Sequence, residues 1–177
     1  MIPLDGPLGE KMARVELLLL DVDGVLTDGR IVHDDAEVET KRFHVRDGLG
    51  IRLLRDEVAV GIVTGRSGAA LRHRCRELDV RWIWDGVGDK AAVLPAVGEQ
   101  TGVAPERTAF VGDDLPDIPL LTRVGVGLAV ADAANEVRAR VDAVTDLPGG
   151  GGAVREVCEA LLRARGRWDS AIARFLI

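Results

Sequence analysis

Short apolar runs alternate with amphipathic segments along most of this chain, and this alternation constrains the fold more than any other feature. Apolar runs of strand length bounded by polar residues predict buried strands at Leu17–Val22, Val58–Val63, Arg81–Trp84, Arg107–Val111, Val124–Val130 and Asp142–Thr145. Helical patterns lie between and after them, at Gly48–Arg55, Ser67–Leu78, Asp89–Thr101, Asp114–Thr122, Ala133–Arg140 and Ala153–Ala164. This alternation predicts an α/β fold, a doubly wound Rossmann-like parallel sheet with helices on both faces.

One stretch interrupts the alternation. Residues 29–43 have the pattern of two short strands joined by a turn near Asp34 and Asp35, which predicts a β-hairpin inserted after the first strand. With 177 residues, of which 47% are hydrophobic, the chain is predicted to form a single domain over residues 1–177. The glycines at 149–152 precede the last long helix and suit either a linker or a functional loop, and a C-terminal tail follows at about 165–177.

Charge and composition argue against several classes of protein. Lys and Arg number 23 against 29 Asp and Glu, a net charge of −6, and this acidic balance disfavours a nucleic-acid binder. Cys75 and Cys158 form no CxxC pair, which favours a reducing compartment. The longest apolar stretch is far shorter than the ~20 residues of a membrane span, and residues 1–10 do not resemble a secretory signal. We therefore expect a cytoplasmic protein with no nucleic-acid or membrane partner.

Acidic pairs follow two of the predicted strands. Asp21 and Asp23 come at the end of the first strand, and Asp113 and Asp114 follow the strand at Arg107–Val111. Open α/β sheets bind ligands at the carboxyl ends of their strands, and like charges this close are costly without a cation. A hard divalent metal ion is therefore predicted at this edge. A solvated acidic turn is the alternative for the first pair.

Two further motifs follow strands. Thr64-Gly65-Arg66 comes after the strand at Val58–Val63, where a hydroxyl and a glycine before a helix suit an anion. An ordinary strand–helix junction is the alternative there. Lys90 lies in the first turn of a predicted helix, where the helix dipole disfavours a cation. This violation of a local preference indicates a functional lysine, and a solvated lysine is the alternative.

The order of these motifs carries a resemblance to a known family. Asp-x-Asp, then Thr, then Lys, then Gly-Asp-Asp, each at a strand end, is similar to the four-motif signature of the haloacid dehalogenase-like phosphatase superfamily. Within it, the chain most resembles the 3-deoxy-D-manno-octulosonate 8-phosphate phosphatases, over nearly its whole length. The resembling segments are Asp21–Gly29, Val45–Ile51, Thr64–Arg66, Val111–Leu115, Ala129–Ala133 and Gly152–Cys158.

This resemblance implies a mechanism of phosphate-ester hydrolysis. Asp21 would be the nucleophile that forms an aspartyl-phosphate. Asp23 would protonate the leaving oxygen and then activate the water that hydrolyses the intermediate. Thr64 and Lys90 would complete the catalytic set by holding phosphate oxygens.

The resemblance also implies a magnesium ion as cofactor. The carboxylates of Asp21 and Asp113 and the backbone carbonyl of Asp23 would bind it, with Asp114 behind these ligands. A carboxylate that approaches a phosphate dianion is repelled by it, and Mg²⁺ together with Lys90 would offset this repulsion.

The substrate implied by the resemblance is a phosphorylated sugar acid. The reaction would convert 3-deoxy-D-manno-octulosonate 8-phosphate to 3-deoxy-D-manno-octulosonate and phosphate, a step of lipopolysaccharide precursor synthesis. Arg66 favours this eight-carbon acid, because phosphatases of nine-carbon 9-phosphates tend to carry Glu there. His44 and Gly151 stand where the family usually has Asn and often Arg, so a nine-carbon sugar acid or another small phosphate ester is the alternative. The implied substrate contacts are Asp23, His44, Val45, Arg46, Asp47, Gly48, Arg52, Thr64, Gly65, Arg66, Arg74 and Lys90.

Two other classes of protein compete with a phosphatase. A signalling receiver domain also places Asp, Thr and Lys around magnesium, but its motif order differs and excludes it. A catalytically silent, phosphatase-like interaction module is the other alternative. The spaces between the motifs hold only the hairpin at about 29–43 and one helix with one strand, so the resemblance implies a phosphatase without a cap domain. Such relatives form homotetramers in which neighbouring subunits close each site, and we expect the same here.

Overall fold

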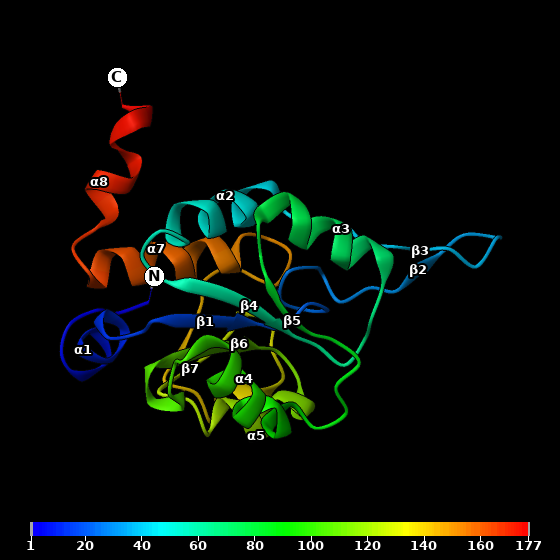
Figure 1. The fold of residues 1–177 in the computed structure, drawn as a ribbon, viewed down its shortest axis with the longest axis horizontal. Coiled ribbons are helices and arrows are strands. Elements are labelled where there is room, and N and C mark those ends of the chain that lie inside the picture. Colours follow the sequence, from blue (N-terminus) through cyan, green and yellow to red (C-terminus); the bar gives the residue numbers. More distant parts are fainter. Residues whose placement is uncertain (1, 177) are drawn as a thin grey trace.

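A six-stranded parallel sheet lies at the centre of the computed structural model, which describes residues 2–176 (Figure 1). Its strands are β1 (Leu17–Leu20), β4 (Ala59–Val63), β5 (Trp82–Trp84), β6 (Thr108–Gly112), β7 (Val126–Ala129) and β8 (Ala143–Val144). They are hydrogen-bonded in the order β5-β4-β1-β6-β7-β8, and every pair is parallel. The predicted doubly wound sheet is confirmed, and each predicted strand is present.

Helices cover both faces of the sheet. Figure 1 shows α2 (Val45–Leu54), α3 (Ala69–Leu78) and α7 (Ala153–Ala164) on one face, and α4 (Leu94–Thr101) and α5 (Ile118–Leu121) on the other. The other helical elements of the described chain are α1 (Pro7–Ala13), α6 (Asn135–Arg138), α8 (Trp168–Ile172), and the 3-10 turns η1 (Lys90–Val93), η2 (Pro105–Arg107), η3 (Leu115–Asp117) and η4 (Ala173–Phe175). Each predicted helix has a counterpart, whereas α1 and α8 are additions from the structure.

The segment at 29–43 leaves the body of the protein as a hairpin. Its strands β2 (Val32–His33) and β3 (Glu39–Thr40) pair antiparallel and form a sheet of their own. The Asp34 carboxylate makes the turn by accepting hydrogen bonds from two backbone N–H groups further along it, both at 2.9 Å. Figure 1 shows the hairpin projecting away from the sheet. The predicted hairpin and its turn are confirmed.

The middle of the sheet forms the buried core. Every residue of β1 is fully buried, and so is Phe110 on the neighbouring strand β6. Because helices cover both faces of these strands, their burial requires a continuous apolar run rather than an alternating one. This is why the apolar runs in the sequence located the strands closely.

The two central strands bring the ends of distant segments together. β1 and β6 are neighbours at the point where the strand order changes direction. Leu20 is level with Val111 of β6 on one side and with Ile62 of β4 on the other. Residues that follow these three strands therefore meet at one edge of the sheet. In doubly wound folds, ligands bind in the crevice at this switch point.

Few residues separate the elements around this edge. Between β1 and α2 the chain inserts only the hairpin, and between β4 and η1 only α3 and β5. Residues 2–176 therefore contain no separate cap domain, in agreement with the expectation. Over the same residues, no helix has the length and apolar character that crossing a bilayer requires.

Candidate active site

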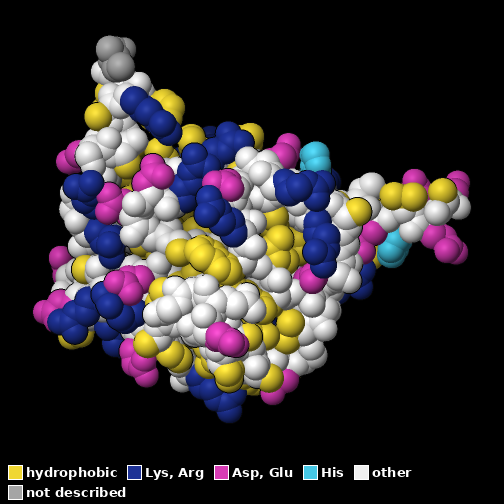
Figure 2. All heavy atoms as spheres, viewed as in Figure 1, with side chains coloured by type: hydrophobic (Ala, Val, Ile, Leu, Met, Phe, Trp, Pro, Cys, Tyr) yellow, Lys and Arg dark blue, Asp and Glu magenta, His cyan; other side chains and the backbone are white. Residues whose placement is uncertain are grey.

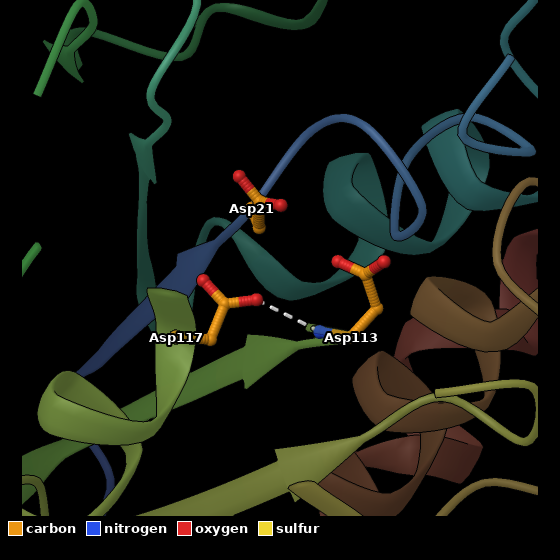
Figure 3. A group of neighbouring side chains, drawn as sticks. All are labelled: Asp21, Asp113 and Asp117. Atoms are coloured by element: carbon orange, nitrogen blue, oxygen red, sulfur yellow. Dashed lines mark hydrogen bonds between the residues drawn. The ribbon is translucent and has the colours of Figure 1, made fainter. Parts of the chain in front are cut away.

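Three carboxylates converge at the switch point of the sheet. Asp21 directly follows β1, Asp113 directly follows β6, and Asp117 ends η3. Figure 3 shows their side chains close together, and an oxygen from each lies within 4.8 Å of the others. Asp21 and Asp117 are buried, and Asp113 is partly exposed. The sequence predicted that Asp21 and Asp113 meet here, whereas the place of Asp117 in this cluster is known only from the structure.

The loop after β6 holds Asp117 in place. Its Oδ2 accepts hydrogen bonds from the backbone N–H groups of Asp113 at 2.9 Å and Asp114 at 3.2 Å. Asp114 is exposed and its carboxylate caps η3 by accepting the N–H of Leu115 at 2.8 Å. Asp117, and not Asp114, therefore lies beside Asp21 and Asp113 in the structure.

The carboxylates of this cluster repel one another. Burial raises the pKa of Asp21 from 3.8 to about 6; the charge of Asp117 adds to this rise and Lys90 opposes it. Burial likewise raises the pKa of Asp113 to about 8, and the charges of Asp21 and Asp117 add to it. Without a further cation, this group of acids therefore retains protons near neutral pH.

Lys90 supplies positive charge to the cluster. Its Nζ lies 2.8 Å from Oδ1 of Asp21 and forms a second ion pair with Asp117. Burial lowers the pKa of Lys90, but the two carboxylates outweigh this effect and raise it above its usual value. The ammonium is therefore charged although it is buried. These two partners explain why a lysine occupies the first turn of η1, where the helix dipole disfavours it.

Glycines line the turn that follows β1. Gly24 has a φ of +91°, and a Cβ there would lie 2.0 Å from Oδ2 of Asp113. A Cβ on Gly149 would lie 1.7 Å from the carbonyl oxygen of Gly24. The glycine loop at 149–152 therefore packs directly against this turn and supports it, which a free linker would not do.

This set of donors suits a hard divalent cation, which prefers oxygen ligands and excess negative charge. Both oxygens of Asp117 are engaged, one by Lys90 and the other by two backbone N–H groups. Burial and the neighbouring carboxylates raise the pKa values of Asp21 and Asp113 in spite of Lys90, so both carboxylates would be stabilised by a further cation. The arrangement fits a metal bound by Asp21 and Asp113, with Asp117 behind them.

Asp23 lies at the rim of the site, under the base of the hairpin. Its Oδ1 pairs with Nζ of Lys41, and its Oδ2 lies 3.7 Å from Nε of Arg66. Glu39 of β3 pairs with the same two cations, at 2.8 Å to Lys41 and 2.9 Å to Arg66. The proposed general acid thus belongs to a ring of two carboxylates and two cations.

Thr64 follows β4 at the same edge of the sheet. The strand register brings it level with the turn after Asp21, and it is buried. Its hydroxyl accepts the N–H of Arg66 at 3.4 Å. Gly65 is exposed, and a Cβ there would approach only the carbonyl oxygen of Val87, at 3.6 Å. The edge therefore presents a hydroxyl group and accessible backbone.

The start of α2 holds a run of predicted substrate contacts. Val45 and Arg46 are exposed. Asp47 is 1% exposed, and its Oδ1 accepts the backbone N–H of Arg155 in α7 at 2.7 Å. Burial raises the pKa of Asp47 above its usual value. His44 is half-buried, and its Nδ1 has no hydrogen-bond partner within residues 2–176. Asp47 therefore joins α2 to α7, and Val45 and Arg46 form the exposed surface of this turn.

Two of the predicted substrate arginines, Arg52 of α2 and Arg74 of α3, contact other groups of the protein. Arg74 pairs with Glu77 at 3.2 Å, and its guanidinium lies 5.8 Å from the ring centre of Phe43. A Cβ on Gly48 would lie 2.3 Å from that guanidinium, so a larger residue there would displace the Arg74 side chain. Arg52 donates to the Glu77 carbonyl at 3.1 Å and lies about 10 Å along α2 from its start. Figure 2 shows that Lys and Arg side chains gather over this part of the surface.

Three residues of the site had no role in the sequence-based prediction: Asp117, Lys41 and Glu39. Asp117 follows Asp114 by three residues, the spacing of a capping box at the start of a helical turn, so a signal for its position was present. Lys41 and Glu39 are two residues apart, which places them on one face of a strand. Which acid they meet depends on how the hairpin folds back, and the local pattern does not contain that information.

Comparison with known sequences relates this arrangement to a family. The sequence model of the haloacid dehalogenase-like hydrolases matches residues 83–156. The 3-deoxy-D-manno-octulosonate 8-phosphate phosphatase KdsC of Escherichia coli K12 is 43% identical over 170 residues, which cover 96% of this chain and 90% of that protein. The protein of the same name from Haemophilus influenzae is 39% identical over 159 residues, which cover 89% of this chain and 88% of the relative.

Solved structures agree with this result. The 3-deoxy-D-manno-octulosonate 8-phosphate phosphatase of Moraxella catarrhalis, in complex with a magnesium ion, a phosphate ion and KDO, has a TM-score of 0.92 and 38% identity, covering 95% of this chain and 97% of that one. The cobalt-bound phosphatase of Haemophilus influenzae has a TM-score of 0.86 and 39% identity, covering 89% and 93%. Fold and carboxylate cluster together define a haloacid dehalogenase-like hydrolase. Within that class, the chain belongs to the 3-deoxy-D-manno-octulosonate 8-phosphate phosphatase family.

Proposed function

We propose that this protein is a magnesium-dependent phosphatase that converts 3-deoxy-D-manno-octulosonate 8-phosphate to 3-deoxy-D-manno-octulosonate and phosphate. The observation that carries the proposal is the group formed by the buried Asp21 and Lys90 and the partly exposed Asp113 at the switch point, in a chain 43% identical to KdsC over most of its length. Burying such charges lowers the stability of the fold. Phosphoryl transfer requires charged groups of this kind near the phosphate, which accounts for their presence.

Asp21 is the nucleophile in this proposal. One of its oxygens attacks the phosphorus atom, the bond from phosphorus to the sugar oxygen breaks, and an aspartyl-phosphate forms. Lys90, 2.8 Å from Asp21, orients the carboxylate and offers positive charge to the phosphate oxygens. Thr64, at the same sheet edge, donates a hydrogen bond to those oxygens. Positioning and neutralisation of charge supply most of the catalysis.

Asp23 transfers the protons. It donates a proton to the sugar oxygen as that oxygen leaves, and then accepts one from the water that hydrolyses the aspartyl-phosphate. Its carboxylate lies beside Lys41 and Arg66, which limits the directions in which it can turn.

Asp21, Asp113 and the backbone carbonyl of Asp23 would hold the magnesium ion, and Asp117 supports them from behind. When bound, the ion neutralises charge on the carboxylates and on the substrate, which reduces the repulsion between two anions. The raised pKa of Asp113, caused first by burial and then by the charges of Asp21 and Asp117, supports this assignment, because a nearby divalent cation would stabilise the deprotonated carboxylate.

Arginines around the site would select the sugar acid. Planar guanidinium groups bind carboxylates in a bidentate manner, and Arg46 and Arg66 are exposed. Arg66 favours the eight-carbon substrate. A nine-carbon sugar acid 9-phosphate, or another small phosphate ester, is the second candidate, since the buried Nδ1 of His44 is unpartnered in the described chain and offers a contact that differs from the family's Asn.

We further propose that the protein is cytoplasmic, serves lipopolysaccharide precursor synthesis, and works as a homotetramer whose neighbouring subunits close each site. Support comes from the hairpin, where Ile31, Val32 and Val38 are 55%, 45% and 54% exposed. Figure 2 shows hydrophobic side chains along the projecting hairpin. Exposed apolar side chains gathered on a projecting element favour association with a second copy.

The C-terminal tail at about 165–177 is a second candidate contact between subunits. Figure 1 shows α8 extending away from the body of the protein. Phe175 and Leu176 near its end are exposed, and Ile177 lies outside the described residues. We propose that this tail covers a site or packs at an interface in the assembly.

One experiment tests the function directly. The value of kcat/KM is measured with 3-deoxy-D-manno-octulosonate 8-phosphate, a nine-carbon 2-keto acid 9-phosphate and p-nitrophenyl phosphate, each with Mg²⁺ and with EDTA. The proposal expects the highest value for the eight-carbon acid and loss of turnover in EDTA. A preference for the nine-carbon acid would support the second candidate. No turnover of any compound would identify a catalytically silent interaction module instead.

The assembly is tested by light scattering at micromolar concentration. A tetramer is expected. A monomer that is fully active and selective would contradict the proposal that neighbouring subunits close the site.

A further inference from the structure

The base of the hairpin contains a charge cluster to which the proposed chemistry assigns no role beyond Asp23 and Arg66. Asp23 follows β1, Glu39 and Lys41 belong to the hairpin, and Arg66 follows β4. Asp23 pairs with Lys41 and Arg66, and Glu39 pairs with the same two cations. The four side chains form a ring in which the sign of the charge alternates.

Burial distinguishes this ring from ordinary surface ion pairs. The side chain of Lys41 is 4% exposed, and those of Asp23 and Glu39 are each 20% exposed. By contrast, the nearby pair of Arg30 and Asp28 is 79% and 43% exposed, with 3.7 Å between its atoms. Burying an ammonium group is unfavourable unless carboxylates compensate it. Burial lowers the pKa of Lys41, but both carboxylates outweigh this and raise it, so the ammonium is charged.

The two cations of the ring differ in what they can reach. Lys41 is covered and its ammonium is shared by two carboxylates, so it is poorly placed to bind a substrate. The side chain of Arg66 is 43% exposed and can extend toward a ligand. Lys41 and Glu39 therefore act on other residues of the ring.

We propose that Lys41 and Glu39 are positioning residues that hold the Asp23 carboxylate in the orientation needed for proton transfer to the leaving group. The proposal rests on the proposed phosphatase function, in which Asp23 is the acid. An aspartate at the rim of an open site has several staggered rotamers available, and proton transfer requires one geometry. Lys41 fixes Oδ1 of Asp23, while Glu39 fixes Lys41 and Arg66. The hairpin base is thereby part of the active site of its own chain.

The test compares two substrates that differ in their need for an acid. The sugar oxygen of 3-deoxy-D-manno-octulosonate 8-phosphate must be protonated as it leaves, whereas p-nitrophenolate leaves as a stable anion. Single-turnover release of the leaving group is measured, because Asp23 also serves the later hydrolysis step. With Lys41→Met, we expect release from the sugar phosphate to fall about 10²-fold and p-nitrophenolate release to fall less than about threefold. Glu39→Gln is expected to show the same pattern as Lys41→Met, with a larger fall for the sugar phosphate than for p-nitrophenyl phosphate. Both falls should be smaller than those in Lys41→Met, and KM should change little.

Two matched variants serve as controls. Glu57→Gln removes a carboxylate that pairs with Arg167 at 2.6 Å and is 23% exposed, close to the value for Glu39. Lys11→Met removes an ammonium that pairs with Asp142 at 2.8 Å on the surface. Both are expected to leave the two release rates unchanged.

Several results would overturn the inference. An equal loss with both substrates, or a change confined to KM, would show that the ring only stabilises the hairpin or binds substrate. Should Lys41→Met fail to fold, as judged by circular dichroism, Glu39→Gln alone decides the question. An active wild-type protein with unchanged variants would overturn this inference and leave the phosphatase function intact. An inactive wild-type protein would overturn both.

Discussion

Nζ of Lys90 lies 2.8 Å from Oδ1 of Asp21 and pairs at the same time with Asp117. The side chains of these residues are only 7%, 7% and 1% exposed, respectively. One ammonium group therefore compensates two buried carboxylates from different segments of the chain. The charge balance of the site depends on this lysine, and its removal has predictable consequences.

Lys90→Met leaves Asp21 and Asp117 buried without their shared cation. Breaking a buried ion pair typically costs about 3–5 kcal/mol, so we expect the free energy of unfolding at pH 8 to fall by several kcal/mol. The loss should shrink at pH 5, because the carboxylates can be protonated there. Urea unfolding at the two pH values measures both effects. Lys11→Met is the control, and equal losses for the two variants at pH 8 would contradict the prediction.

Asp21→Asn is expected to abolish turnover and leave the fold intact. The amide keeps the size of the side chain, and burial already disfavours the charged form of Asp21, whose pKa is raised to about 6. Lys90 retains Asp117 as a partner. Circular dichroism and p-nitrophenyl phosphate turnover check the two expectations. Substantial Mg²⁺-dependent activity in this variant would show that Asp21 is not the nucleophile.

Magnesium binding should release protons at neutral pH. The pKa values of Asp21 and Asp113, about 6 and about 8, lie above the ordinary 3.8. Between the ordinary pKa of 3.8 and these raised values, the metal-free folded state binds more protons than the unfolded state. The contribution of both groups to stability therefore falls as pH rises from about 4 to about 8. A metal needs the deprotonated carboxylates, so its affinity should rise with pH over the upper part of this range.

Calorimetry tests this linkage. The increase in Tm on adding Mg²⁺ should be larger at pH 8 than at pH 5.5, and EDTA should reverse it. Titration of Mg²⁺ at pH 7 in two buffers of different ionisation enthalpy should give different apparent heats, because protons are released. Equal affinity across pH 6 to 8 would contradict the prediction.

Gly24→Ala should prevent Asp113 from keeping its position. The new Cβ would lie 2.0 Å from Oδ2 of Asp113, and φ is +91°. Gly102→Ala is the control, because φ is +72° there and nothing lies within 4 Å of its Cβ. Both variants carry the backbone strain of about 1–2 kcal/mol, but only Gly24→Ala should lose the stabilisation by Mg²⁺. The increase in Tm on adding Mg²⁺ measures this stabilisation. An increase in Gly24→Ala as large as in the wild-type protein would refute the argument.

Much of the fold was predictable because β1 and its neighbours are buried on both faces, which makes each of them a continuous apolar run. The start of α2 was less predictable. The helix begins at Val45, three residues before the predicted start at Gly48, in a segment with a β-branched residue and glycine that are poor helix formers. The bond from Asp47 to α7 stabilises this turn, and a contact between distant segments leaves no local pattern.

The site was predictable to a similar degree. Parallel strands end at one edge, so the sequence correctly brought Asp21 and Asp113 together. In the following loop it named Asp114 and gave Asp117 no role. Asp114 became a helix cap and Asp117 a partner of Lys90, and this choice depends on the path of η3. The pairing of Lys41 with Asp23 likewise requires the folded hairpin.

Asp47 acts as the N-terminal cap of α7 from another helix. Gly152 occupies the capping position of α7 and has no side chain to accept a hydrogen bond, while Oδ1 of Asp47 accepts the N–H of Arg155 at 2.7 Å. Loss of a cap costs about 0.5–2 kcal/mol, so Asp47→Ala should lower the free energy of unfolding by that amount. Asp47→Asn keeps an acceptor oxygen and should retain most of it.

Asp47→Ala should also show whether the turn at the start of α2 contributes to substrate binding or to the chemical step. Asp47 fixes the turn that carries His44 and Arg46, so Asp47→Ala is expected to raise KM for the sugar acid phosphate severalfold. The value of kcat for p-nitrophenyl phosphate, which lacks the sugar acid, should change little because the carboxylate cluster lies on other segments. Steady-state kinetics on the two substrates measures this split. If Asp47→Asn raised KM as much as Asp47→Ala, the charged carboxylate itself would contact the substrate, and the capping role would not explain its effect.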